Sequence, residues 1–124
     1  MKKVIYTNLA PEPVGPYSQA IQAGNYLYCS GQIAINPENN KFIDGTIEQQ
    51  TLLIMKNIQS LLKASGFGFE DVVKTTCFLD DMNNFTIFNE IYAKYFVSNP
   101  ARSCVEAKLP KGAKVEVEVI AYKD

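Results

Sequence analysis

The strict alternation near the C-terminus constrains the fold of this chain most. Residues 115–119 read Val-Glu-Val-Glu-Val, which predicts a half-buried strand with valines on one face and with Glu116 and Glu118 on the other. A second strand-like run starts at Arg102, after the helix stop at Asn99-Pro100. The last quarter of the chain therefore places an arginine and two carboxylates on rigid strands. Because the sequence contains no histidine, acid–base chemistry near neutral pH would fall to carboxylates, tyrosines or cysteines.

The first third of the chain predicts a hairpin. Two β-prone runs, 20–23 and 26–29, flank Gly24-Asn25, and glycine supplies the positive φ that a type II′ turn requires. The second run continues through Ser30-Gly31-Gln32. A glycine inside a strand pattern predicts a bulge or a close approach of another group to the backbone.

Two helices are predicted. Thr46 and Gln49 have the spacing of a capping box, apolar residues follow at helical spacing, and Gly66 is a suitable C-terminal cap. The second helix carries an aromatic stripe and stops before Pro100. The expected order is strands at 4–6, 20–23 and 26–35, a loop over 36–45, a helix over 47–65, a strand at 72–79, a helix over 85–96, and strands from 102 and over 115–119.

This order predicts an α+β fold: one domain over residues 1–124, with two helices packed on one face of one sheet. Alternate residues of a strand point to opposite faces, and apolar residues occur on both: Val73 and Leu79 on one face, and Val72 and Phe78 on the other. Two helices cannot cover both faces. We therefore expect self-association into a closed oligomer that buries the remaining face.

Composition excludes several functional classes. The net charge is -1 and no basic run is present, so nucleic-acid binding lacks its usual electrostatic source. The longest aliphatic run, residues 52–55, is far too short to span a membrane, and no signal-peptide pattern occurs at the start. The three cysteines form no CxxC pair and no metal-ligand spacing, which predicts free thiols, a cytoplasmic location and no metal site.

Arg102, Glu116 and Glu118 are the first candidates for chemistry. Arg102 could form an ordinary surface ion pair, or it could grip a substrate carboxylate through two parallel hydrogen bonds. The glutamates could line a solvated face, or one of them could hold and polarise a water molecule. A tight hairpin between the last two strands would set Glu116 near Lys108 and away from Arg102. Their meeting at one site does not follow from the residues alone.

Other candidates have an ordinary and a functional interpretation. Asn89 lies on the aromatic stripe, where its amide could bond nearby backbone, face a ligand or order the loop around Ser30-Gly31. Tyr17 follows Gly15-Pro16 and could be a core tyrosine or a phenol at a pocket mouth. Ser30 and Gly31 could offer a hydroxyl and backbone N–H groups. Cys104 is interpreted as pocket wall, because a Cys–His nucleophile cannot exist without histidine.

Several of these residues belong to short motifs that occur in order from about Val4 to the C-terminus. The motifs are Gly15-Pro16-Tyr17-Ser18-Gln19-Ala20, Ser30-Gly31-Gln32, Val73-Lys74-Thr75-Thr76, Phe88-Asn89-Glu90-Ile91-Tyr92, Pro100-Ala101-Arg102-Ser103-Cys104-Val105 and Leu109-Pro110 through Val115-Glu116-Val117-Glu118. As a set, in this order and spacing, they resemble the RidA (YjgF) family of imine deaminases. One departure is a segment between Cys104 and Leu109 that is one residue shorter than in some relatives.

The resemblance implies a chorismate-mutase-like fold and a homotrimer with three sites in the clefts between subunits. It implies hydrolysis of 2-imino acids and their enamine tautomers, such as 2-iminobutanoate and 2-iminopropanoate, to 2-oxo acids and ammonia, without a cofactor. Carried over to this sequence, Arg102 would bind the substrate carboxylate and Glu116, which the motif favours over Glu118, would position the attacking water. The resemblance also implies that the pocket is lined by Tyr17, Ser30, Gly31, Asn89 and the backbone at Cys104.

Two rival functions come from other classes. The first is an RNA-cleaving translation inhibitor, a role also attached to this family; the absence of histidine, of a metal cluster and of a basic stripe argues against it. The second is a holdase or binding module whose clefts sense a small carboxylate without turnover. Ammonia release distinguishes the deaminase from both.

Overall fold

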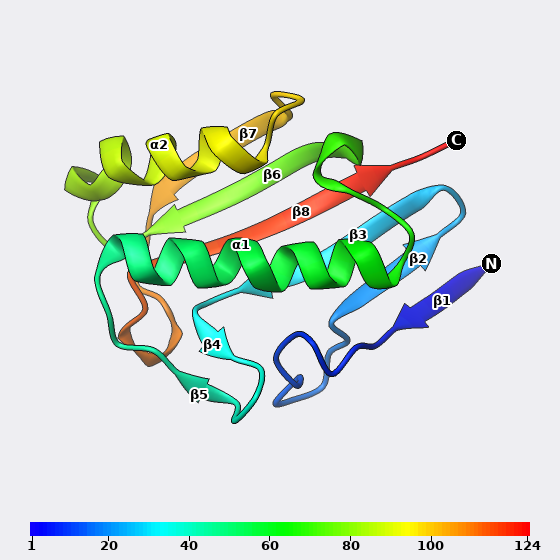
Figure 1. Cartoon of the computed structure of the whole chain (residues 1–124), viewed down its shortest axis with the longest axis horizontal. Helices are drawn as coiled ribbons and strands as arrows, with labels where there is room; N and C mark the ends of the chain where they lie inside the picture. The colour runs from blue at the N-terminus through cyan, green and yellow to red at the C-terminus, as the bar shows by residue number, and fades with distance from the viewer.

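The structure is a computed structural model that describes residues 1–124. It has the expected α+β architecture: a six-stranded mixed sheet carries two helices on one face, and a separate two-stranded sheet lies beside it (Figure 1). The strands are β1 (Lys2–Ile5), β2 (Ala20–Ala23), β3 (Tyr26–Gln32), β4 (Ile35–Asn36), β5 (Lys41–Phe42), β6 (Val72–Leu79), β7 (Ala101–Glu106) and β8 (Val115–Tyr122). The helices are α1 (Ile47–Ala64) and α2 (Phe85–Tyr95). Short 3₁₀ turns precede β6 at Phe69–Asp71, α2 at Met82–Asn84 and β8 at Pro110–Gly112.

The strand order of the large sheet is β1-β2-β3-β8-β6-β7. All neighbours are antiparallel except β6 and β7, which run parallel because α2 carries the chain back between them. The tight hairpin considered for the last two strands is therefore wrong: β6 lies between β7 and β8. In the observed register Glu116 pairs with Phe78 of β6, not with the region of Lys108.

Local signals in the sequence set most element boundaries. The β2–β3 turn has Gly24 at φ 61°, while Asn25 keeps a negative φ, as a type II′ turn requires. The capping box at the start of α1 is confirmed: the Gln49 N–H donates to Thr46 Oγ1 and the Thr46 N–H donates to Gln49 Oε1. At its end, Gly66 at φ 79° closes a Schellman motif, with backbone N–H groups of residues 66 and 67 donating to the carbonyls of residues 63 and 62.

Several boundaries differ from the prediction. The strand predicted over 26–35 ends at Gln32, because Ile35 pairs with Phe42 of β5 in the separate sheet, and the last strand continues beyond residue 119 to Tyr122. The first strand begins at Lys2 and ends at Ile5, earlier than the predicted 4–6. The segment 36–45 is not wholly a loop, because β4 and β5 pair within it. Its turn depends on Asn40, which adopts a left-handed φ of 57° and donates its N–H to the Asn36 carbonyl. Asparagine tolerates that conformation better than most residues, so a polar stretch could still form a hairpin.

A bulge in β6 changes which residues face the helices. The register shifts between Val72 and Lys74, so Val72 and Leu79 are both buried, whereas Val73 and Phe78 point to the other face. The predicted division of these four residues was therefore wrong. The prediction of an uncovered apolar face is confirmed, since the face opposite the helices exposes Tyr26, Tyr28, Val73 and Val105.

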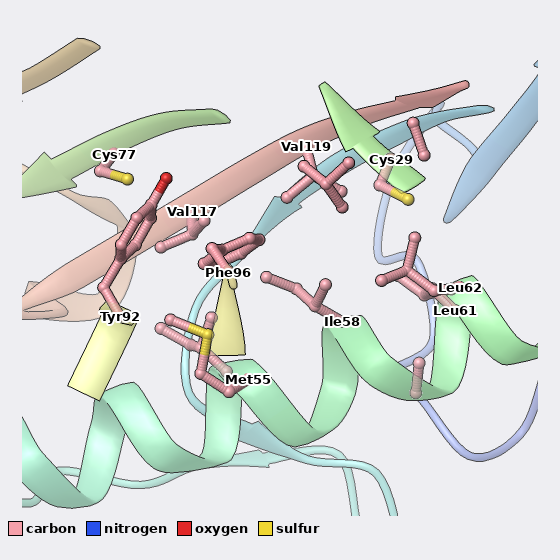
Figure 2. Packing of buried hydrophobic residues seen from close by; sticks show 14 of the residues in the cluster. Cys29, Met55, Ile58, Leu61, Leu62, Cys77, Tyr92, Phe96, Val117 and Val119 are labelled. Atoms are coloured by element: carbon pink, nitrogen blue, oxygen red, sulfur yellow. The ribbon is translucent and has the colours of Figure 1, made fainter. Parts of the chain in front are cut away.

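The core lies between the sheet and the two helices. Figure 2 shows Met55 and Ile58 of α1 directed toward the sheet, with the Phe96 ring between them and Val117 of β8, and with Tyr92 at one side of the cluster. The alternation that predicted β8 is thus satisfied: its valines are buried and its glutamates face away from the helices. Neither α-helix has the length and hydropathy needed to span a membrane.

Candidate functional site

A cleft lies where β3 and β8 meet the loop of residues 11–17, and we call it the β3–β8 cleft. Its volume is about 540 Å³. Four of the predicted site residues line it: Tyr17, Ser30, Gly31 and Glu116. Glu118 lines the same cleft, so the structure places both glutamates of β8 at one surface. Gly31 and Glu116 come from neighbouring strands and Tyr17 from the loop before them.

Gly31 makes room for the carboxylate of Glu116. The β3–β8 register shifts between Cys29 and Gln32, so Gly31 sits in a bulge. A Cβ at position 31 would overlap the carboxylate group of Glu116. Both alternatives for this glycine, a bulge and a close approach, are therefore realised together, and they bring a carboxylate against a bare stretch of backbone.

We predict that Gly31→Ala disables the cleft without unfolding the protein. The added methyl group forces the Glu116 side chain to turn away. A catalytic group that is misplaced by about 1 Å can lower the rate of its reaction up to about 100-fold, here the imine hydrolysis that the resemblance implies. Steady-state kinetics and thermal melting check this. Wild-type kcat together with a normal melting temperature would show that the position of the carboxylate is unimportant.

Glu116 is half-buried in this cleft, and its environment favours the protonated form. Burial raises the pKa of the Glu116 carboxyl above its ordinary value of 4.5, and repulsion from the charge on Glu118 raises it further. A carboxyl whose pKa lies closer to neutrality can both accept and return a proton. This is the property that a group activating water requires.

The same pKa shift predicts a pH-dependent cost in stability. Because the pKa of Glu116 is higher in the folded state, its contribution is fully favourable below pH 4.5 and is lost as the pH rises through the folded value. Glu116→Gln removes this cost, so its melting temperature should exceed that of the wild type at pH 8 by a few degrees. The gap should close on acidification to pH 4. A difference in melting temperature that stays constant between pH 8 and pH 4 would show that the pKa of Glu116 is not raised by folding.

Tyr17 and Ser30 present polar atoms at the mouth of the cleft. The Tyr17 side chain is 53% exposed, so the interpretation as a core tyrosine is wrong, and its hydroxyl accepts from the Val14 N–H at 3.4 Å. The Ser30 hydroxyl donates to the Ser18 carbonyl at 2.6 Å. With its hydrogen committed, Ser30 can only accept from a bound molecule, such as an iminium or ammonium group.

Arg102 and Asn89 form a second candidate region at the other side of the molecule. Together with Tyr92 and Pro100 they line a shallow hollow of about 470 Å³ between α2 and β7, which we call the α2–β7 hollow. Nη1 of Arg102 donates to Oδ1 of Asn89 at 2.7 Å. Asn89 therefore neither bonds nearby backbone through this oxygen nor reaches the loop around Ser30-Gly31. Arg102 pairs here with an amide instead of the carboxylate of an ordinary surface ion pair.

Cys104 lies two residues after Arg102 on β7, on the same face of the sheet. Its side chain is half-buried against the core. Burial raises the pKa of the Cys104 thiol, and the positive charge of Arg102 partly opposes this. A neutral thiol in this position is consistent with a wall and not with an attacking group.

Within one chain the two regions lie on opposite faces of the sheet. Arg102 pairs in register with Thr75, whose side chain is fully buried beneath the helices, whereas Glu116 alternates with buried valines and points outward. Strand β6 separates the two strands. A single protomer therefore cannot bring Arg102 and Glu116 to one ligand.

Sequence reasoning missed two charged residues of the β3–β8 cleft. Glu12 and Lys111 line it, and Lys111 holds a left-handed φ of 58° beside Gly112. Proline and glycine at positions 110 and 112 are typical of a turn, but nothing in the sequence indicates that this turn lies beside β3. Lys111 comes close to β3 because β8, which follows this turn, is inserted between β3 and β6.

Known proteins resemble this chain along nearly its whole length. The family described as Endoribonuclease L-PSP matches residues 7–123. A RutC family protein of Pyrococcus horikoshii is 50% identical over 126 residues, covering 100% of both chains. The chloroplastic Reactive Intermediate Deaminase A of Arabidopsis thaliana is 48% identical over 97% of this chain and 65% of its own length.

A solved structure shows the same fold. The TdcF protein of E. coli, crystallised with bound serine, superposes with a TM-score of 0.92 at 35% identity and covers 98% of this chain and 99% of that one. Sequence and fold thus agree over the full set of elements. The expected resemblance is confirmed, and the chain belongs to the Endoribonuclease L-PSP family, in which the RutC and Rid proteins are grouped.

Proposed function

We propose that the protein hydrolyses reactive 2-imino acids and their enamine tautomers, such as 2-iminobutanoate and 2-iminopropanoate, to 2-oxo acids and ammonia. The observation that carries this proposal is the state of Arg102. Its guanidinium is held beside an open hollow and donates to a neutral amide at 2.7 Å, which leaves most of its five N–H donors available for a carboxylate. Membership in a family that includes a reactive intermediate deaminase supports the same reaction.

The chemistry requires little beyond orientation. A protonated imine is already electrophilic at carbon, so water adds to the C=N bond, and the resulting tetrahedral adduct expels ammonia to leave the 2-oxo acid. Glu116 accepts a proton from the attacking water, returns it to the nitrogen, and then takes the remaining hydroxyl proton as ammonia departs and the C=O bond forms. Its raised pKa suits these steps. Arg102 holds the carboxylate end of the substrate, and Tyr17, Ser30, Gly31, Asn89 and Cys104 complete the pocket.

The test is ammonia release from freshly generated 2-iminobutanoate. A threonine dehydratase supplies the imine, and the rates of ammonia and 2-oxobutanoate formation are compared with and without the protein. We expect both rates to rise above spontaneous hydrolysis in proportion to protein concentration. Binding of 2-oxobutanoate without any such rise would instead favour a carboxylate-binding module.

We further propose a homotrimer in which the β3–β8 cleft of one protomer faces the α2–β7 hollow of the next. The separation of Arg102 and Glu116 on opposite sheet faces supports this, since a second chain is needed to unite them. The exposed apolar face supplies the contact area, with Tyr28 45% and Val105 47% exposed in the isolated chain.

Sedimentation should give a mass about three times the 13.8 kDa of one chain. Val105→Lys places a charge on the apolar sheet face and should shift the protein toward monomers and abolish deaminase activity together. Leu52→Lys is the matched control, because Leu52 is exposed on α1, which covers the opposite face of the sheet. A stable wild-type monomer at micromolar concentration would contradict the trimer.

The lining of the β3–β8 cleft disfavours RNA as its substrate. Three carboxylates, those of Glu12, Glu116 and Glu118, and a single cation, Lys111, face it. This charge balance repels a phosphate backbone. Incubation of nuclease-free protein with messenger RNA should leave the RNA intact under conditions in which imine turnover is measurable.

A further inference from the structure

The guanidinium of Arg102 lies against two aromatic rings of α2. Its central carbon is 4.7 Å from the centroid of the Tyr92 ring and 5.4 Å from that of Phe85. Both distances are within the range of cation–π attraction. The residue itself is exposed, on the edge strand β7. An exposed arginine would otherwise move among many rotamers, so these contacts distinguish Arg102 from an ordinary surface cation.

The contacts with Arg102 come from one stripe of α2. Phe85, Asn89 and Tyr92 are separated by four and three residues, which places their side chains on the same face of a helix. The two rings meet the guanidinium while the Asn89 oxygen accepts from Nη1. Three different residues therefore restrain one planar group.

The Tyr92 ring is itself tied to the sheet. Its hydroxyl lies 2.7 Å from Oγ1 of Thr75, a fully buried residue of β6. Figure 2 shows the Tyr92 side chain reaching from α2 toward β6, with its hydroxyl near Cys77. Thr75 is also the residue that pairs in register with Arg102. The ring that supports the guanidinium is thus anchored to the strand next to the one that carries it.

We propose that Phe85 and Tyr92 are positioning residues that hold the Arg102 guanidinium ready for a substrate carboxylate, with Thr75 locking the Tyr92 ring. This rests on the proposed function, in which Arg102 binds the carboxylate of a 2-imino acid. If the arginine side chain is already ordered, binding does not require it to lose conformational entropy, and the affinity for the carboxylate is higher. Neither aromatic residue needs to touch the substrate.

Arg102 is the only arginine in the sequence, which allows a direct test. In protein labelled with ¹⁵N-arginine, the Nε–Hε group gives one signal, and its relaxation reports the order of this guanidinium alone. We expect an ordered signal in the wild type and a partly mobile one in Tyr92→Phe, which keeps the ring but loses the hydrogen bond to Thr75. Phe85→Leu and Tyr92→Leu should give a mobile signal. Ile87→Ala, on the opposite face of α2, is the matched control and should leave the signal unchanged.

Binding of 2-oxobutanoate, the product of the proposed reaction, provides the second measurement. Calorimetry should show a roughly tenfold weaker Kd for Phe85→Leu, a smaller weakening for Tyr92→Phe, and no change for Ile87→Ala. In an Arg102→Ala background, Phe85→Leu should have no further effect on kcat/KM, because the aromatic residue acts only through the arginine. A general structural role would not give this dependence.

The two measurements separate the possible failures. An Arg102 signal that stays ordered in both leucine variants overturns the positioning role, and so does an unchanged Kd when order is lost. Phe85 is half-buried at the helix start, so its variant retains the fold even if Tyr92→Leu does not. If the wild type releases no ammonia from 2-iminobutanoate yet the arginine becomes mobile as expected, the proposed reaction fails while the aromatic restraint stands.

Discussion

Replacing Arg102 by alanine should lower kcat/KM for imine hydrolysis roughly 100-fold, because charge-assisted hydrogen bonds contribute about 1.5–3 kcal/mol each. The side chain is exposed and its polar contact is with Asn89, so the fold and the oligomer should persist. Kinetics with dehydratase-generated imine and sedimentation of the same samples test both parts.

Two controls isolate the role of the guanidinium. Lys56→Ala removes one positive charge from an exposed position of α1 and should leave the kinetics unchanged. Arg102→Lys keeps the charge but loses the fork and the stacking on aromatic rings, so it should recover only a small part of the activity. A wild-type rate in Arg102→Ala would remove this residue from the mechanism.

Glu116→Gln should lower kcat about 100-fold, the lower end of what a positioned proton carrier contributes. Glu118→Gln should change kcat only about twofold, because Glu118 is exposed and does not approach Gly31 as Glu116 does. The pair is well matched, since both residues lie on the same face of β8 and line the same cleft.

The pH profile adds a second criterion. The charge of Glu118 helps to raise the pKa of Glu116, so Glu118→Gln should lower that pKa and move the acid limb of the kcat profile to lower pH. If Glu118→Gln had the larger effect on turnover, Glu118 would be the residue that activates water.

Mixing the two inactive variants tests whether the site is shared. In trimers with randomly exchanged chains, an Arg102→Ala protomer can supply Glu116 while a neighbouring Glu116→Gln protomer supplies Arg102, so about a quarter of the sites should be intact. Activity should therefore return after subunit exchange. No recovery in mixed trimers would mean that each site forms within one chain.

Much of the fold followed from local patterns. The Val-Glu alternation of β8, the glycine turn between β2 and β3, and the capping box of α1 each act through contacts a few residues apart, and all three appear as predicted. Alternation was less reliable in β6. It predicted Val73 and Leu79 on the same face of the strand, and one bulge places them on opposite faces. A single extra residue shifts every later side chain to the other face.

The site shows the same division between local and long-range information. The sequence by itself determined which side chains are present: one arginine, two outward carboxylates on β8 and no histidine. The tertiary structure alone decided their neighbours, since inserting β8 between β3 and β6 set Glu116 against Gly31 and separated it from Arg102. It also seated Arg102 on the rings of α2. Strand order depends on long-range pairing and on crossovers, and neither leaves a short-range pattern in the chain.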